Sequence, residues 1–336
     1  MSEAIRIGLI GCGGNMRSAH VPRLLKNPDA RIVALCEPSQ ENVKRLLEAH
    51  PSLTEVPVYD DYRKMLEAGG LDAVEISTPH TLHAQQILDS LRAGLHVLVE
   101  KPMVCTVADA RAVIAARDAA GKQLLVSYQR HYAGSWRYCR QQILSGTLGP
   151  LHFIQAYQCQ NWWQPNHPSA QAWRKKPELS GGGQLNDSGS HLIDIILWAS
   201  NLVPEEVFAY ISNQGAQVDI LSAICVRFRG GAIGNISVVG QSKRGFDEEV
   251  NLWGAEGCLQ VLGTGRQRLI YHNPDAREIP PEERPDFGDP DTNFINAILG
   301  REEVQSPAEC GLRVIALTEA IWKSAASGQP ERCAEV

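Results

Sequence analysis

The chain of 336 residues is 43% hydrophobic and 21% charged, a composition close to the average of soluble globular proteins that suggests neither disorder nor a fibrous repeat. Its formal net charge of -6 provides no broad basic surface for a phosphate backbone, so we expect no nucleic-acid partner. The length exceeds what one hydrophobic core usually supports, so two domains are expected.

The N-terminus, the hydropathy and the cysteines favour a cytoplasmic protein. The first residues include the acidic Glu3 and a short apolar run that ends in glycines, unlike an export signal. No stretch reaches the roughly 18 uninterrupted apolar residues of a membrane span. The nine cysteines are scattered singly without a C-x-x-C pair, so we predict reduced thiols and no metal site.

Strand-like apolar runs alternate with helical patterns in residues 1–127. The predicted strands span residues 5–10, 31–36, 71–76, 95–99 and 123–127. The predicted helices span residues 15–26, 41–49, 81–93 and 107–120, and Gly94 and Gly121 end the last two. This alternation predicts parallel strands with crossover helices, and therefore an α/β domain of the Rossmann type with a doubly wound parallel sheet.

From about residue 150 the pattern changes to consecutive strands. They are predicted at residues 151–160, 207–211, 221–228, 232–239, 248–254 and 258–262, with a hairpin turn at Gly230-Gly231. The run predicts a second, α+β domain at residues 128–336 with a large, mostly antiparallel open sheet. Helices are predicted at residues 294–299 and 308–324, and the sequence does not say on which domain they pack.

The turn after the first predicted strand has the features of a dinucleotide site. Residues 11–16 read Gly-Cys-Gly-Gly-Asn-Met, in which Gly11 permits a tight turn and Gly13 lets a pyrophosphate approach the backbone. The phosphate charge would lie at the N-terminus of the following helix. Met16 occupies the third glycine position, which indicates looser packing of helix against strand. The alternative interpretation is an ordinary glycine turn.

Glu37 ends the second predicted strand, where a carboxylate can accept hydrogen bonds from the hydroxyls of the adenosine ribose. The carboxylate would repel a 2′-phosphate, and the next three residues, Pro-Ser-Gln, include no cation to bind one. NAD is therefore predicted in preference to NADP. A solvated glutamate at a strand end is the alternative, and it is less common together with a glycine turn.

Polar residues also follow two later predicted strands. Ser-Thr-Pro-His at residues 77–80 follows one of them, and Glu100-Lys101-Pro102 follows the next. The carboxyl ends of strands line the crevice where ligands bind in open α/β sheets. Lys101 could there polarise a hydroxyl or stabilise a developing alkoxide. The alternative is an exposed lysine in a solvated loop.

Residues 181–194, GGGQLNDSGSHLID, lead into a helical run. Asp187, His191 and Asp194 are spaced i, i+4 and i+7, so on a helix they would share one face and a carboxylate would orient the imidazole. Histidine is suited to removing a hydroxyl proton while the carbon gives up hydride. The alternative is that Asp187 caps the helix and His191 is a core residue.

Together these motifs resemble the Gfo/Idh/MocA family of oxidoreductases, which includes glucose-fructose oxidoreductase and inositol dehydrogenase. The resemblance runs from about residue 5 to residue 324. It rests on the GCGG turn with His20 downstream, Glu37, STPHTLH at residues 77–83, Glu100-Lys101-Pro102, Trp173-Arg174 and residues 181–194. It implies an NAD-dependent enzyme that transfers hydride between nicotinamide and a secondary alcohol of a sugar, inositol or related polyol.

The resemblance also implies roles for single residues. Lys101 would contact substrate and nicotinamide, with Asp187 and His191 as an acid and base pair in which His191 is the base. The implied cofactor-binding residues are Gly11, Gly13, Asn15, Met16, Glu37, Thr78, Pro79, His83, Glu100, Lys101, Gln129, Trp173 and Arg174. The substrate would contact Lys101, Asp187 and His191, and Trp162 and Trp163 could stack on a sugar ring or, with equal weight, fill an interface.

The sequence leaves two alternative functions open and predicts an oligomeric state. The family resemblance also allows a sugar-modifying enzyme that oxidises its substrate transiently with a tightly held NAD. A non-catalytic protein that senses NAD or sugar is a further alternative, against which Lys101, Asp187 and His191 argue. Alternating apolar positions such as Leu221 and Ala223 leave a sheet face to cover, so a homodimer or homotetramer is expected.

Overall fold

The computed structural model describes residues 4–164, 173–263 and 267–336, and the chain divides into two compact units. The first unit comprises Met1–Val104, Ala108–Tyr128 and Gly288–Glu309. The second comprises Cys105–Val107, Gln129–Phe287 and Cys310–Val336. The first unit is therefore assembled from segments that lie far apart in the sequence.

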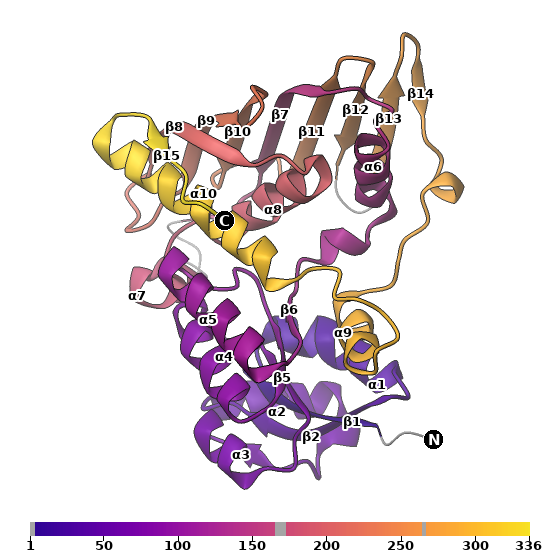
Figure 1. Ribbon diagram of the computed structural model, residues 1–336. Helices are drawn as coiled ribbons and strands as arrows, with labels where there is room; N and C mark the ends of the chain where they lie inside the picture. The colour runs from indigo at the N-terminus through magenta and orange to yellow at the C-terminus, as the bar shows by residue number, and fades with distance from the viewer. Residues whose placement is uncertain (1–3, 165–172, 264–266) are drawn as a thin grey trace. The chain divides into compact units, whose positions relative to one another are not determined.

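A six-stranded parallel sheet forms the centre of the first unit (Figure 1). Its strands are β1 (Ile5–Ile10), β2 (Ala30–Cys36), β3 (Val58–Tyr59), β4 (Ala73–Ile76), β5 (His96–Val99) and β6 (Leu124–Val126). They lie in the order β3-β2-β1-β4-β5-β6, which is that of a doubly wound dinucleotide-binding sheet. The predicted α/β fold is confirmed, and only the two-residue strand β3 was not predicted.

Helices flank this sheet because its strands are largely apolar on both faces; all three residues of β6, for example, are apolar and buried. The helices are α1 (Val21–Lys26), α2 (Gln40–Ala49), α3 (Tyr62–Ala68), α4 (His83–Arg92), α5 (Val107–Ala120) and α9 (Pro290–Ile298). Phe294 and Ile295 of α9 join the same core as Leu9 and Leu35. The helix predicted at residues 294–299 thus packs on the first sheet. The sequence alone did not say on which domain it packs.

The second unit contains a nine-stranded sheet. Its strands are β7 (Leu151–Cys159), β8 (Pro204–Ser212), β9 (Leu221–Phe228), β10 (Ile233–Val239), β11 (Asp247–Gly254), β12 (Gly257–Leu262), β13 (Arg268–His272), β14 (Ala276–Glu278) and β15 (Glu331–Arg332). Their order is β14-β13-β12-β11-β7-β10-β9-β8-β15, and β7 and β10 are parallel whereas the other neighbours are antiparallel. The predicted mostly antiparallel sheet is confirmed, although β13, β14 and β15 were not predicted.

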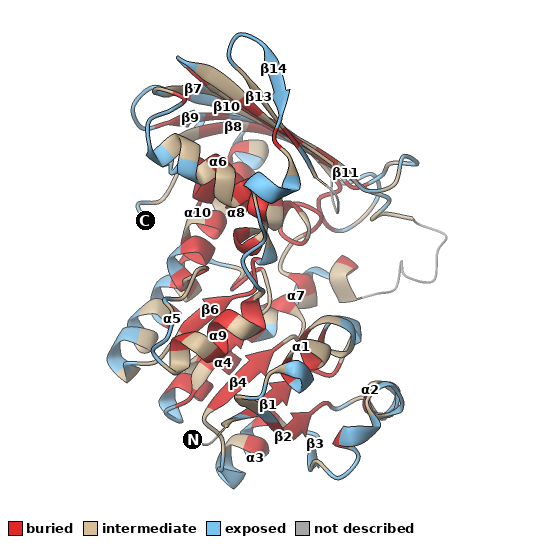
Figure 2. Ribbon diagram, turned by 90° about the vertical axis from the view of Figure 1, so that its right-hand side faces the viewer, coloured by how far each residue is buried: buried red, intermediate tan, exposed pale blue. Residues whose placement is uncertain are grey.

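One face of the nine-stranded sheet is buried beneath helices and the other is open (Figure 2). The helices of this unit are α6 (Gly134–Leu144), α7 (Pro177–Ser180), α8 (Gly189–Ser200) and α10 (Ala308–Ser327). Along β9 the exposure alternates, so that Ile224 and Val226 are buried while Ala223 and Cys225 are exposed. Gly230 and Gly231, with φ of 88° and 94°, form the turn of the β9–β10 hairpin, as predicted.

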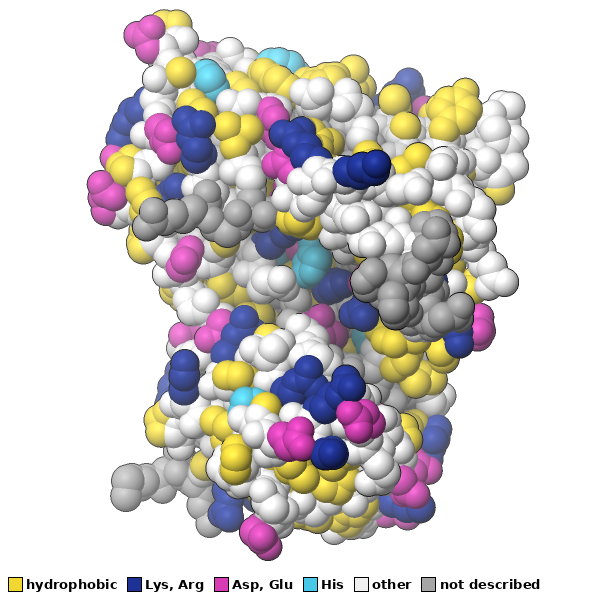
Figure 3. Space-filling view, turned by 180° about the vertical axis from the view of Figure 1, so that it is seen from behind, with side chains coloured by type: hydrophobic (Ala, Val, Ile, Leu, Met, Phe, Trp, Pro, Cys, Tyr) yellow, Lys and Arg dark blue, Asp and Glu magenta, His cyan; other side chains and the backbone are white. Residues whose placement is uncertain are grey.

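Two further features of the described structure are the distribution of charges on its surface and the state of its cysteines. Acidic and basic side chains are intermixed on the face drawn in Figure 3. The nine cysteines all lie within the described ranges and form no disulfide, and five of them are buried. Within those ranges we find no helix with both the length and the hydropathy of a membrane span.

Candidate active site and cofactor site

The loop between β1 and α1 has the backbone that a dinucleotide turn requires. Gly11 has a φ of 90°, and a Cβ atom at this position would lie 2.5 Å from the backbone oxygen of Ser77. Only glycine fits there. A Cβ atom on Gly13 would meet no described atom within 4 Å, so this glycine leaves open space beside the backbone. The contact of a pyrophosphate with this backbone stays a prediction.

Met16 is completely buried, although it replaces the third glycine of the fingerprint. The helix predicted at residues 15–26 contains a π-helical turn at Met16–His20, in which the Val21 N–H donates to the Met16 carbonyl. A π-turn is wider than an α-helical turn. The wider turn coincides with the larger side chain, and because Met16 is fully buried its packing is not loose.

Glu37 connects the end of β2 to the glycine loop. Its side chain is 7% exposed, with Oε2 accepting a hydrogen bond from the Cys12 N–H and Oε1 accepting one from the Ser39 N–H, both at 2.9 Å. The alternative of a solvated glutamate is therefore wrong. Because each carboxylate oxygen can accept a further hydrogen bond, both remain able to bind ribose hydroxyls.

The loops after β4 and β5 are joined through His83. This side chain is fully buried, and its Nδ1 and Nε2 lie 2.9 Å and 3.0 Å from the backbone oxygens of Pro102 and Thr78. Burial lowers the pKa of His83. The histidine thus fixes Thr78 and Pro79 relative to the loop that carries Lys101, and the cofactor contact implied for it by resemblance stays a prediction.

Glu100 belongs to a buried charged cluster centred on His20. Nε2 of His20 lies 3.1 Å from Oε1 of Glu100, and Nδ1 lies 2.7 Å from Oδ1 of Asp291 on α9 and 3.6 Å from Oε2 of Glu75 on β4. Nδ2 of Asn15 lies 3.3 Å from the same Nε2. His20 was part of the recognised motif, but Glu75 and Asp291 were not predicted. A glutamate in the apolar strand Ala-Val-Glu-Ile is the signal that was overlooked.

The charges in this cluster follow from its pKa shifts. Burial lowers the pKa of His20, but Asp291, Glu100 and Glu75 outweigh it and hold this pKa well above its usual value. Burial raises the pKa of Glu100, but the hydrogen bond and charge of His20 and the charge of Lys101 leave it well below its usual value. Glu100 and His20 therefore form a buried ion pair that fixes the residue next to Lys101.

In the second unit, His191 is the one residue of α8 that is not buried. It faces a cavity of about 480 Å³. The cavity is lined by Gln129, Arg130, Ala133, Gln158, Ser188, His191, Phe246 and Gln267. Six of these eight side chains can form hydrogen bonds, and they include Gln129 from the predicted set.

The predicted arrangement of Asp187, His191 and Asp194 on one helical face is wrong. The helix begins at Gly189, so Asp187 precedes it, because the glycine-rich segment continues in turns up to Ser188. Ser188 is the N-cap and makes no capping hydrogen bond with its side chain, so the alternative role of Asp187 as a cap is also wrong. Asp194 binds another partner, since its Oδ2 lies 2.8 Å from Nε2 of His131.

Asp187 is nevertheless brought together with two other predicted residues. Its side chain is buried, and Oδ2 accepts hydrogen bonds from Nε1 of Trp162 at 2.8 Å and pairs with Nε of Arg174 at 3.1 Å. The Arg174 guanidinium also lies over the ring of Trp173, 4.5 Å from its centre. Lys101 belongs to the first unit and Asp187 and His191 belong to the second.

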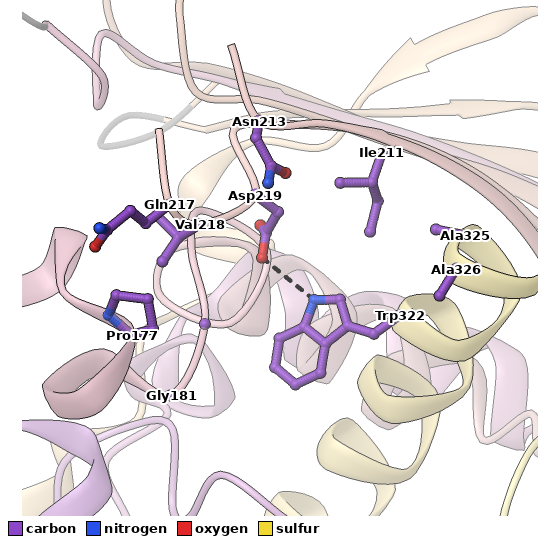
Figure 4. A pocket seen from close by; sticks show the side chains of 11 residues that line it. Pro177, Gly181, Ile211, Asn213, Gln217, Val218, Asp219, Trp322, Ala325 and Ala326 are labelled. Carbon is purple, nitrogen blue, oxygen red and sulfur yellow. Dashed lines mark hydrogen bonds between the residues drawn. The ribbon is translucent and has the colours of Figure 1, made fainter. Parts of the chain in front are cut away.

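Asp219 is a positioning residue that the sequence did not reveal. Its carboxylate accepts hydrogen bonds from the N–H groups of Gly183 and Leu185 at 2.9 Å and 2.7 Å, and from Nε1 of Trp322 at 3.2 Å (Figure 4). A Cβ atom on Gly183 would lie 2.0 Å from the Asp219 backbone oxygen, so this glycine is obligatory. The contact fixes the loop that precedes Asp187.

Comparisons with known proteins show which family the chain resembles. Residues 5–128 match the family described as "Oxidoreductase family, NAD-binding Rossmann fold", and residues 136–260 match the "GFO/IDH/MocA C-terminal domain". D-glucoside 3-dehydrogenase of Escherichia coli (strain K12) is 28% identical over 199 residues, which are 59% of this chain and 54% of that protein. The 1,5-anhydro-D-fructose reductase of Ensifer adhaerens is 29% identical over 272 residues, 77% of this chain and 79% of that protein.

A solved structure extends the likeness over the whole chain. The WlbA dehydrogenase from Bordetella pertussis, in complex with NADH and UDP-GlcNAcA, is 25% identical and has a TM-score of 0.86. The match covers 100% of this chain and 99% of that one. With both family domains present in sequence and their architecture in the fold, the chain belongs to the GFO/IDH/MocA family of oxidoreductases.

Proposed function

We propose that the protein is an NAD-dependent dehydrogenase that oxidises a secondary alcohol of a sugar, inositol or related polyol. The observation that carries the proposal is the position of His191, the one accessible residue of a buried helix, in a cavity lined by hydrogen-bonding groups. A polyol needs many donors and acceptors, and Gln129, Gln158 and Ser188 offer both. The names of the D-glucoside and anhydro-D-fructose relatives support this substrate class.

Three residues have separate roles in the proposed reaction. His191 accepts the hydroxyl proton as general base. Lys101 stabilises the negative charge that develops on the substrate oxygen, and Asp187, fixed by Trp162 and Arg174, is the acid and base partner of His191. When bound, NAD supplies the acceptor for the hydride that leaves the carbon. The products are the ketone, a proton on the protein and the reduced cofactor.

The glycine loop and Glu37 fit NAD as this cofactor. Gly13 leaves space beside the backbone, and the carboxylate of Glu37 retains acceptor capacity for the ribose. The relative solved with NADH supports the assignment. Gly11, Asn15, Met16, Thr78, Pro79, Glu100, Trp173 and Arg174 are proposed to contact the remainder of the cofactor.

The reaction is tested by following the absorbance of reduced nicotinamide with a panel of sugars, sugar acids and inositols. Turnover of at least one of these compounds with NAD is the expected result. If no compound is oxidised with either cofactor and the protein instead forms a stable complex with another protein, the dehydrogenase assignment fails and a regulatory role replaces it.

We predict that the protein binds NAD about 10- to 100-fold more tightly than NADP, because hydrogen bonds to an ionised carboxylate are strong and the same carboxylate repels a 2′-phosphate. Isothermal titration with each cofactor measures the ratio. The double variant Glu37→Ser and Pro38→Arg should move the preference towards NADP. Glu41→Gln, an exposed glutamate on α2, is the control that should change neither affinity. Tighter binding of NADP by the unaltered protein would disprove the assignment.

We also propose that the open face of the nine-stranded sheet forms a homodimer or homotetramer. Tyr210 and Ile233 on this face are 70% and 49% exposed, and Tyr210 pairs with the exposed Ala223. Exposed apolar groups of this size favour burial against a second copy. Sedimentation at micromolar concentration should show an oligomer, and Tyr210→Lys should dissociate it whereas Tyr210→Phe should not. A monomeric unaltered protein contradicts this proposal.

A further inference from the structure

The second unit contains a buried lysine, Lys175, that the proposed reaction does not use. Its side chain is 8% exposed, and within the described residues its Nζ has no hydrogen-bond acceptor. Nζ lies 5.6 Å from the ring centre of Trp162 and 5.3 Å from that of Trp163. The Nε1 atom of Trp163 is also buried and has no acceptor in the same part of the chain. Two donors therefore lie close together without acceptors.

A buried ammonium group is costly unless it is paired and hydrogen-bonded. The two indole rings provide part of the compensation through cation–π attraction, but an indole face accepts no full hydrogen bond. Burial accordingly lowers the pKa of Lys175. The cost that remains would be offset by a ligand that brings an acceptor with negative charge.

Two other basic side chains of the second unit, those of Arg174 and Arg130, already have partners. Nε of Arg174 pairs with Asp187, and Nη1 of Arg130 lies 2.7 Å from both carboxylate oxygens of Glu248. These guanidinium charges are balanced within the second unit. Lys175 thus differs from both in offering a positive charge with no matching carboxylate among the described residues.

The position of Lys175 relates it to the proposed active site. The indole N–H of Trp162 donates to Asp187, while Lys175 lies over the ring of the same tryptophan. One indole ring therefore separates the ammonium group from Asp187. A substituent bound by Lys175 would therefore lie about one indole ring away from Asp187.

We propose that Lys175 and the indole N–H of Trp163 bind a carboxylate of the substrate, so that the preferred substrate is a sugar acid. This inference rests on the dehydrogenase function proposed above and specifies its substrate class. A carboxylate presents two acceptor oxygens, which matches one ammonium and one indole donor. A phosphate has three acceptor oxygens and more charge, and guanidinium groups that could supply further donors are paired with carboxylates here.

The test is to titrate the protein, in the presence of NADH, with acidic and neutral sugars of the same configuration. D-glucuronate and D-galacturonate should bind about 10-fold or more tightly than D-glucose and D-galactose, since a charged hydrogen bond distinguishes them. Lys175→Met should abolish this difference and leave the neutral sugars unchanged. Lys176→Met, at the adjacent exposed lysine, is the matched control and should retain it.

Each outcome has a distinct meaning. Equal binding of the acidic and neutral sugars by the unaltered protein overturns the carboxylate subsite, and it does so even if Lys175→Met fails to fold. Tighter binding of D-glucose 6-phosphate than of D-glucuronate overturns the assignment to a carboxylate. Oxidation of neutral sugars alone leaves the dehydrogenase intact and overturns the subsite. Lys175-dependent binding of uronates without any turnover supports the subsite and overturns the proposed reaction.

Discussion

Replacing His191 with alanine is expected to lower kcat by about 100- to 10,000-fold, which is the usual contribution of a positioned general base. The side chain lines the cavity while the other residues of α8 are buried, so its removal should leave the helix and the fold intact. Affinity for NAD should change little. Steady-state kinetics with a verified substrate, together with a titration of NAD, measures both quantities.

The control for this variant is His152→Ala, which removes an exposed histidine on β7 in the same unit. It should retain normal turnover. If His191→Ala turned over at a near-native rate, the assignment of the base would be wrong. Lys101 or Tyr128 would then be the leading candidate for proton transfer.

Lys101→Ala is expected to reduce kcat by a comparable factor of about 100- to 1,000-fold, because it removes an electrostatic donor aimed at the reacting oxygen. The neighbouring Glu100 is held by the His20 ion pair, so the loop should keep its conformation in the variant. The measurement is kcat and KM with the same substrate. Lys26→Ala, at an exposed lysine at the end of α1, should leave both values unchanged.

A kcat of Lys101→Ala within about twofold of normal would contradict the electrostatic role. A rise in KM with kcat unchanged would assign Lys101 to substrate binding alone, because such a change removes binding that is equal in the ground state and the transition state.

The parts of the fold that could be predicted are those with a local signal. The long parallel strands are rich in apolar residues, and Gly11 and Glu37 stand at strand ends, where the backbone of the turn and the hydrogen bond from the Cys12 N–H restrict the residue type. The short strand β3 and the short helix α7 carry too few residues for a periodic pattern. The π-helical turn at Met16–His20 depends on a side chain packing into the core, which spacing alone does not report.

The sequence indicates candidate residues for the site but not how they are arranged. The spacing of Asp187 and His191 fits a helix, yet the glycine-rich segment delays the start of α8 by two residues beyond Asp187. Asp219 and Asp291 act through contacts with residues 34 or more positions away, and such partners leave no pattern in a single sequence. The long-range hydrogen bonds that position the loops of the site could thus be found only in the structure.

The inclusion of α9 in the first unit has a consequence for synthesis of the chain. Asp291 pairs with His20, and Phe294 packs in the same core as Leu9. Until the residues of α9 have been synthesised, the first unit therefore lacks part of its hydrophobic core and the carboxylate that pairs with His20. During translation this unit must wait for the whole of the intervening sheet. A chimaera built on residues 1–127 should therefore also carry the 288–309 segment.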